Sequence, residues 1–203
     1  MGRLSSVGLI LICALSLAAC APKHKEQEPC GFVQNVYGER ISWKGSDTVA
    51  LNVHESFPPE MMPALNAAIK DWELALGRPM FQIRQTNFPS SGPQQDGYNV
   101  IYWMKNWEAE KSLEQARTSV YWVGDQIREA DIRLNAANFN FYLDNPSDYR
   151  SVHLESLLVH ELGHVLGLKH KEDFGSVMAT YLASMSKRTE ISAADKADLK
   201  CEY

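Results

Sequence analysis

The sequence predicts an α+β domain in which a helix lies across a twisted sheet. Three observations support this fold class. Segments with strand and helix patterns follow one another in the order strand, helix, four strands, helix, helix. Of the 203 residues, 45% are hydrophobic and 22% are charged, which excludes a collagen, a coiled coil and a disordered chain. The length is that of one large domain.

Local periodicity predicts the strands and the first helix. Residues 48–53 (TVALNV) alternate and favour a strand. Residues 60–76 carry hydrophobic side chains at helical spacing, and Gly77 is a typical helix end. Four further segments have strand composition: 80–86, 98–104, 118–123 and 130–134.

The remaining chain alternates between irregular segments and helices. Residues 87–97 are rich in Pro, Ser, Gly and Gln, which predicts a loop. An irregular stretch at 136–150 precedes a long helix expected over 151–166. The final helix should begin at Ser192, because Ser192 and Asp195 have the spacing of a capping box.

The first 19 residues are typical of a secretory signal. Arg3 precedes an uncharged, apolar run from Val7 to Ala19. This run is shorter than the ~20 residues with which a helix crosses a bilayer. A positive start, a short apolar core and small residues at its end predict a signal peptide over residues 1–19.

The end of that run resembles the lipobox of bacterial lipoproteins. Residues 17–20 read LAAC, and the resemblance implies that Cys20 is acylated and becomes the first residue of the mature chain. Two acyl chains suffice for stable anchoring, so we expect the membrane as a partner through this lipid anchor. Ala21 stands where the inner-membrane retention signal has Asp, which favours the outer membrane of a bacterial cell envelope. Residues 20–45 then hold the lipidated cysteine, a polar tether and an N-terminal segment ahead of a domain at 46–203.

Two cysteines remain once Cys13 has left with the signal and Cys20 carries lipid. Cys30 and Cys201 lie at opposite ends of the folded part. In an exported protein, two spare cysteines predict one disulfide.

The charge balance argues against nucleic acid as a partner. The chain has 20 Lys+Arg against 25 Asp+Glu, a formal net charge of −5. A protein that binds duplexes normally has a surplus of basic residues, so we expect no nucleic acid partner.

The pattern H-E-x-x-H-x-x-G-x-x-H occupies the predicted long helix and the residues after it. His160 and His164 lie 40° apart on one face of a helix, because each residue turns the helix by 100°. A continued helix would carry His170 ~15 Å away from His160. Gly167 permits the chain to turn back, so that His170 becomes a third nitrogen ligand. Three protein ligands and one open position predict one catalytic Zn²⁺ ion.

Glu161 flanks the expected ion without needing to bind it. Zinc lowers the pKa of its water ligand to about 7, and a neighbouring carboxylate can take that proton and pass it to a leaving amine. The arrangement predicts metal-assisted hydrolysis of a peptide bond with Glu161 as the general base. The opposite face of the helix is expected in the core: Leu154, Leu158, Leu162, Val165 and Leu166.

This long motif resembles that of the metzincin zinc peptidases, and its spacing to Met178 resembles that of the matrixins. The resemblance implies a twisted, mixed five-stranded sheet with an active-site helix, a C-terminal helix and a Met-turn that places Met178 under the three histidines. The histidine and aspartate set of the matrixin structural zinc is not recognisable. His54 and His153 are therefore expected to be structural or surface residues. The sequence makes no prediction about structural Ca²⁺.

The resemblance also assigns a place to the substrate. In matrixins the fourth strand is an antiparallel edge on which the peptide adds as a further strand. Residues 179–186 would form a wall of the pocket for the side chain after the scissile bond, or an ordinary connecting loop. The strand residues expected at the edge are Thr118, Ser119, Val120, Tyr121, Trp122 and Val123.

Some residues depart from the family pattern. Lys171 follows the third histidine where vertebrate matrixins usually have Ser, and Tyr181 is too far from Met178 to be the tyrosine ligand of related families. Residues 29–31 (PCG) resemble part of the matrixin propeptide switch, in which a thiolate caps the zinc. Cys30 therefore has two readings, the disulfide with Cys201 or this switch.

We expect a monomeric zinc endopeptidase that acts on a protein or peptide substrate. Two alternatives remain open at this point. The chain could be a zinc hydrolase that acts on cell-wall peptides, or an inactive peptide-binding module on the same scaffold. The intact Glu161 argues against the inactive module, because losing this carboxylate is the simplest way to lose activity.

Overall fold

The computed structural model describes residues 26–45 and 48–203. The predicted signal peptide and the predicted lipidation site Cys20 lie outside these residues. Within them, no helix is long and apolar enough to cross a bilayer.

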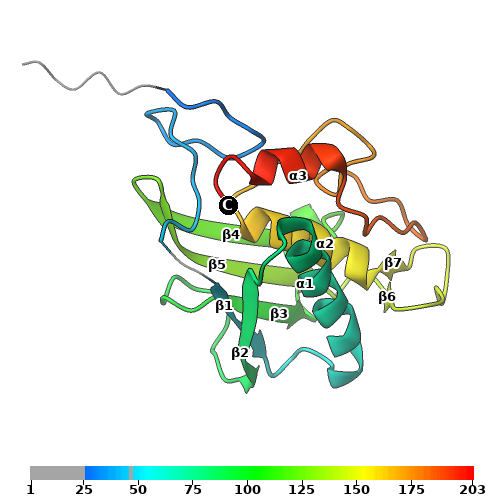
Figure 1. Cartoon of the computed structure of the whole chain (residues 1–203). Coiled ribbons are helices and arrows are strands. Elements are labelled where there is room, and N and C mark those ends of the chain that lie inside the picture. The colour runs from blue at the N-terminus through cyan, green and yellow to red at the C-terminus, as the bar shows by residue number, and fades with distance from the viewer. Residues whose placement is uncertain (1–25, 46–47) are drawn as a thin grey trace, which may run out of the picture.

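Five strands form one mixed sheet in the order β2-β1-β3-β5-β4 (Figure 1). Strand β1 is parallel to β2 and β3, β3 is parallel to β5, and β4 is antiparallel to β5 at the edge. The predicted mixed five-stranded sheet is therefore confirmed. The strands are β1 (Val49–His54), β2 (Phe81–Phe88), β3 (Val100–Met104), β4 (Ala116–Val123) and β5 (Gln126–Asn135).

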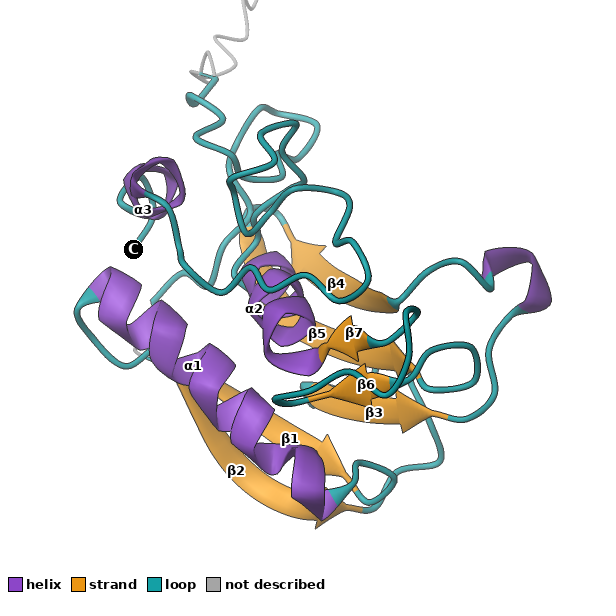
Figure 2. Ribbon diagram, turned by 90° about the vertical axis from the view of Figure 1, so that its right-hand side faces the viewer, coloured by secondary structure: helices purple, strands orange, loops and turns teal. Residues whose placement is uncertain are grey.

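Two long helices cover the same face of this sheet (Figure 2). They are α1 (Met62–Leu76), which follows a 3-10 turn at Pro59–Met61, and α2 (Leu154–Val165). Helix α1 ends at Gly77, as predicted, and this glycine adopts the left-handed conformation with φ 72°. The indole of Trp72 is fully buried and donates to the carbonyl of Val159 at 2.9 Å, so α1 and α2 are joined by a hydrogen bond as well as by packing.

The core lies between these helices and the sheet. All five hydrophobic residues predicted on the inner face of α2 have no exposed surface. They meet side chains from α1 and the central strands, among them Leu65, Ile101, Ile132 and Leu134. Burial of this stripe stabilises α2 against the sheet and fixes which side of α2 faces away from the core.

Two boundaries differ by three or four residues from the sequence predictions. Helix α2 begins at Leu154 and not at 151, because Val152–His153 form a short strand, β7, that pairs with β6 (Phe141–Tyr142). His153 accepts a hydrogen bond from the Ser156 amide and so caps α2. Strand β5 begins at Gln126 and not at 130, because its first half pairs with the end of β4.

The C-terminal helix α3 (Ala193–Leu199) begins where the sequence predicted. Ser192 is its N-cap, and the reciprocal hydrogen bonds of a capping box with Asp195 are both present. A further 3-10 turn at Ala109–Lys111 lies in the connection between β3 and β4.

The N-terminal segment packs along the domain. Phe32 is fully buried in the main core and forms an isolated β-bridge with Leu168, and the Val33 amide donates to the carbonyl of Gly167 at 2.9 Å. Ser42 forms a second bridge with Gln126. The segment therefore joins the loop after α2 to the turn between β4 and β5.

The predicted disulfide between Cys30 and Cys201 is present, with 6.3 Å between the Cα atoms. It closes a sequence separation of 171 residues and ties the N-terminal segment to the end of α3. Beside it, Arg40 donates to the Glu202 carboxylate at 2.5 Å and to the Cys201 carbonyl at 3.2 Å. This arrangement supports the disulfide with Cys201, and not the zinc switch, as the role of Cys30.

Cys30→Ala and Cys201→Ala should lower the unfolding free energy by the same amount. The chain-entropy model gives an upper bound of about 5 kcal/mol for so long a loop, and we expect a few kcal/mol. Denaturant unfolding of both single variants and of the double variant measures this loss. If Cys30 were a zinc switch, Cys30→Ala alone would raise activity, and intact-mass analysis without reductant would find a free thiol at Cys201.

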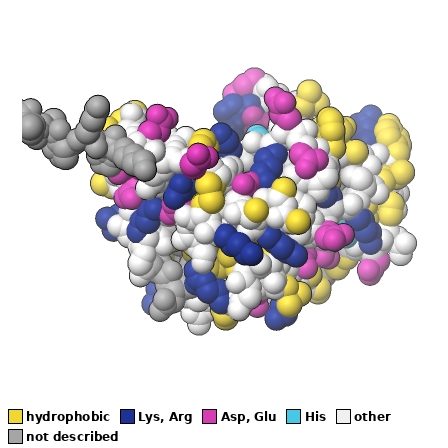
Figure 3. Space-filling model, turned by 45° about the horizontal axis from the view of Figure 1, so that its top comes forward, with side chains coloured by type: hydrophobic (Ala, Val, Ile, Leu, Met, Phe, Trp, Pro, Cys, Tyr) yellow, Lys and Arg dark blue, Asp and Glu magenta, His cyan; other side chains and the backbone are white. Residues whose placement is uncertain are grey.

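The surface carries charges of both signs. On the face drawn in Figure 3, Lys and Arg side chains are interspersed with Asp and Glu, and smaller hydrophobic groups lie among them. No broad patch of one charge covers the described residues on this face.

Candidate metal centre

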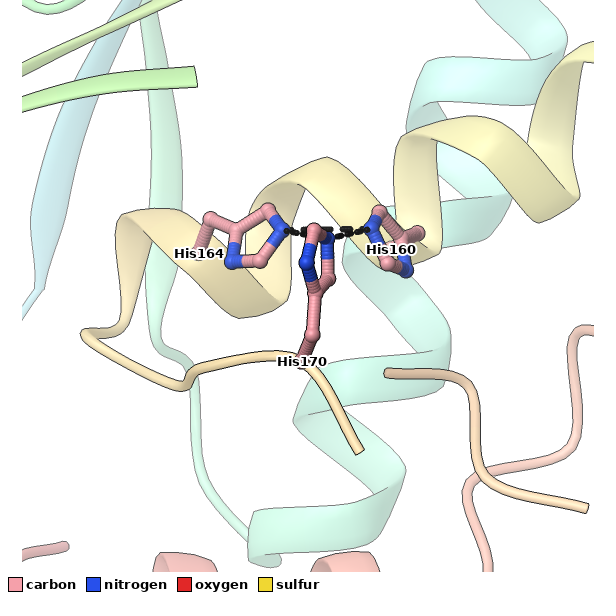
Figure 4. Close-up of side chains that lie close together, drawn as sticks. All are labelled: His160, His164 and His170. Atoms are coloured by element: carbon pink, nitrogen blue, oxygen red, sulfur yellow. Dashed lines mark hydrogen bonds between the residues drawn. The ribbon is translucent and has the colours of Figure 1, made fainter. Parts of the chain in front are cut away.

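Three imidazoles converge on one point above α2 (Figure 4). His160 and His164 come from successive turns of α2, and His170 comes from the loop that follows it. Their Nε2 atoms lie 3.1 Å (His160–His164), 3.1 Å (His164–His170) and 3.2 Å (His160–His170) apart. Nitrogen ligands at 2.0–2.1 Å from one tetrahedral ion would lie ~3.3 Å apart. The three side chains are thus positioned for a zinc ion.

Hydrogen bonds on the far side of two rings orient their lone pairs inward. The Nδ1 atom of His160 lies 2.8 Å from the Val177 carbonyl, and that of His164 lies 2.8 Å from the Leu168 carbonyl. A carbonyl can only accept, so each Nδ1 carries the proton and each Nε2 offers a lone pair. Burial lowers the pKa of His160 to about 3 and lowers the pKa of His164 and His170 as well. All three rings are therefore neutral near pH 7, as metal ligation requires.

Gly167 is the residue that lets His170 return to this point. Its φ is 95°, a conformation that side chains with a Cβ rarely adopt. A Cβ at this position would also lie 2.2 Å from the carbonyl oxygen of Ile41 in the N-terminal segment. The glycine in the motif thus satisfies both a backbone turn and a close approach of two segments.

Glu161 is buried on the cleft side of α2, next to the imidazoles. Burial raises the pKa of its carboxyl to about 7, against the opposing effect of a hydrogen bond from Thr118. That bond runs from Thr118 Oγ1 to Glu161 Oε2 at 2.6 Å. The Oε1 atom accepts no hydrogen bond within the described part of the chain, so it is the oxygen left for a substrate or a water molecule.

Met178 packs against α2 at Gly163. It is fully buried, and a Cβ built at Gly163 would lie 2.2 Å from its sulfur. Gly163 is the residue before His164 in α2, so the methionine packs against the helix between the two histidine turns. The chain reaches this position through a tight turn, in which the Ala179 amide donates to the Ser176 carbonyl at 3.1 Å.

The buried carboxylate of Asp195, in α3, stabilises this turn. Asp195 has no exposed surface and accepts hydrogen bonds from Ser176 Oγ, from the Val177 amide and from Lys171 Nζ, the last at 2.9 Å. The Lys171 amide in turn donates to the Met178 carbonyl at 2.9 Å. Lys171 and Asp195 therefore link the segment after His170, the turn and α3. The sequence indicated Asp195 only as part of the capping box of the final helix. It indicated Lys171 only as a residue that departs from the family pattern.

A pocket of about 630 Å³ opens beside the imidazoles. Strand β4 forms one side, and Thr118, Val120 and Trp122, which alternate along it, all line the pocket. The six residues predicted at the substrate edge all belong to β4, which pairs with β5 on one side and with no strand on the other among the described residues. The opposite wall comes from α2 and from residues 179–182, within the segment 179–186 proposed as a pocket wall.

The role of Thr118 was not found from the sequence. The strand pattern placed Thr118 at the edge, but nothing in that pattern indicates that its hydroxyl reaches Glu161. The two residues are 43 positions apart, and only the packing of β4 against α2 brings them together. No pattern of neighbouring residues in the sequence indicates such a contact.

Comparison with known proteins agrees with this geometry. The matrixin family model matches residues 86–203, which include the edge strand, α2, all three histidines, Met178 and α3. No match was found among the curated proteins. Because the matched part covers more than half of the sequence and carries the whole candidate centre, the chain belongs to the matrixin family of metallopeptidases.

Proposed function

We propose that this protein is a zinc-dependent endopeptidase. The observation that carries the proposal is the convergence of three inward-facing Nε2 atoms beside a buried carboxylate, next to an edge of β4 that pairs with no strand of the described residues. His160, His164 and His170 would hold the zinc ion, and the family match supports the choice of metal and reaction. A bound zinc ion supplies Lewis acidity, which lowers the pKa of a water ligand to about 7 and polarises a carbonyl.

Glu161 is placed to move the proton in this reaction. Its Oε2 is held by Thr118, which leaves Oε1 to accept a proton from the attacking water and to donate it to the amine that leaves. Burial of the carboxyl raises its pKa and so favours its protonated form midway through the cycle. The Thr118 hydroxyl opposes this by favouring the charged form, which the first proton transfer needs.

The substrate would lie along β4. An extended peptide can pair with the free edge of this strand through main-chain hydrogen bonds, with alternate side chains turned towards the pocket. The pairing recognises backbone and not sequence, which suits an enzyme that cuts within unfolded segments. Side-chain preference would then come from the pocket that residues 179–182 and α2 enclose.

A substrate panel tests the proposal. The zinc-loaded protein is incubated with an unfolded protein and, separately, with peptides of bacterial cell-wall cross-links, and products are identified by mass. We expect internal cleavage of the unfolded protein that stops when a chelator is added. Cleavage of the cell-wall peptides alone would favour the alternative hydrolase. Peptide binding without any cleavage would favour the inactive module.

We also propose that Cys20 anchors the protein to a bacterial membrane, with the outer membrane as the expected location. Cys20→Ser should abolish acylation and either block processing or release the protein from the membrane fraction, because the acyl chains would supply the anchor. Fractionation of cells and intact-mass analysis of the mature chain measure both effects. A wild-type mature chain whose N-terminus lies elsewhere and which lacks Cys20 would refute the anchor.

A further inference from the structure

We infer that Arg188 makes the pocket beside the metal centre selective for an acidic side chain, so that the enzyme prefers a Glu or Asp immediately after the scissile bond. This inference deepens the proposed endopeptidase function and rests on it. It concerns the class of substrate, which neither the long motif nor the family match assigns.

Arg188 is a fixed part of the pocket and not a mobile surface cation. Its amide donates to Ser156 Oγ in the first turn of α2 at 2.7 Å. Its guanidinium donates from Nη1 to the Tyr181 carbonyl at 2.9 Å and from Nη2 to the Ala179 carbonyl at 3.0 Å. These bonds hold the planar group between α2 and the wall at 179–182, where it lines the same pocket as His160 and Glu161.

The guanidinium has no counter-ion among the residues that the structure describes. No carboxylate of residues 26–45 or 48–203 lies within salt-bridge distance of Arg188, and its Nε is buried without a hydrogen-bond partner. Asp195 is the carboxylate whose charge acts on Arg188, and Asp195 is already bonded to Lys171. The other arginine of the pocket, Arg117, is paired with Glu114 and Glu108.

The remaining donors of Arg188 suit a carboxylate. Each Nη has given one N–H to a wall carbonyl and retains a second. A carboxylate from a substrate would satisfy these donors through charge-assisted hydrogen bonds, while Leu157 and Leu182 contact its methylene groups. A neutral amide of the same shape would form weaker hydrogen bonds with these donors. Hydrogen bonds that involve charged groups typically tighten binding by roughly 10–100-fold relative to a ligand that lacks them.

Matched peptides test this inference. Three fluorogenic peptides differ only at the residue after the cleaved bond, which is Glu, Gln or Leu, and kcat/KM is measured for each with the zinc-loaded protein. We expect the wild type to prefer Glu over Gln by about 10-fold or more. Arg188→Met should bring this ratio to about 1 or below, and Arg188→Lys should retain part of it. Because each ratio is taken within one protein sample, an inactive or unfolded fraction cancels.

A control separates the pocket from a general charge effect. Arg84 is exposed on β2, away from the pocket, so Arg84→Met should keep the wild-type ratio. Equal rates for Glu, Gln and Leu peptides in the wild type, or a ratio that Arg188→Met leaves unchanged, would overturn the inference while leaving the endopeptidase function in place.

A binding measurement distinguishes a failure of this inference from a failure of the proposed endopeptidase function. If no peptide is cleaved, the proposed function fails, and the affinities of the Glu and Gln peptides for the protein decide the inference separately. Fluorescence polarisation should give about 10-fold tighter binding of the Glu peptide to the wild type and equal binding of both peptides to Arg188→Met. Equal binding of both peptides to the wild type would overturn it.

Discussion

Glu161→Gln is expected to lower kcat by about 10²–10⁴-fold, the usual contribution of a general base, while the protein keeps its zinc and its fold. The amide of Gln has nearly the shape of the carboxylate, and its oxygen can still accept the Thr118 hydrogen bond seen at 2.6 Å. It cannot take a proton from water near pH 7. Turnover of a fluorogenic peptide, together with zinc content and a thermal melt, measures the effect.

A neighbouring carboxylate provides the matched control for this variant. Glu172 is exposed two residues after His170, so Glu172→Gln should leave kcat within about two-fold of wild type, as surface substitutions usually do. A Glu161→Gln protein that retains more than a tenth of the wild-type kcat would show that Glu161 is not the base.

His164→Ala is expected to lose the metal and, with it, measurable activity. Two of the three Nε2 atoms would remain, which leaves fewer protein ligands than catalytic zinc sites have. Because a ligand that binds only the folded state stabilises it, zinc should raise the melting temperature of the wild type and not that of His164→Ala. Metal analysis of the purified variant and melts with and without zinc measure both effects.

His54 provides the control for this second variant. Its ring bonds to Ser56 Oγ at 2.8 Å in the structure and does not belong to the cluster of potential metal ligands, so His54→Gln should keep one zinc per chain. A His164→Ala protein that binds zinc as tightly as the wild type would contradict the assignment of this ligand.

The metal centre could be predicted because its spacing is set by local geometry. His160 and His164 share a face of any regular helix, and Gly167 can end that helix with the positive φ that returns His170. The order of strands and helices likewise followed from periodicity, which depends on residues close together in the chain. Each of these features has a signal within a dozen residues.

The residues that position and shape the site have no such signal. Thr118 reaches Glu161 across 43 residues, and Lys171 reaches Asp195 across 24. Which polar side chains meet in the folded state depends on tertiary packing. Local patterns in a single sequence do not reveal these contacts. The first half of β5 was missed for a related reason. Glu129 has an ionisable side chain, yet it is buried, and one of its carboxylate oxygens accepts a hydrogen bond from the Gly97 amide in the loop before β3.

The central claim is that three histidines and Glu161 form a zinc-dependent hydrolytic centre, and a zinc titration of metal-free protein tests it most directly. Peptide cleavage is measured after each addition of zinc, and bound metal is measured in parallel. We predict no cleavage without metal, a linear rise to a plateau at one zinc per chain, and loss of activity when a chelator removes the ion. Metal-free protein that cleaves at the rate of the zinc-loaded protein would contradict the claim.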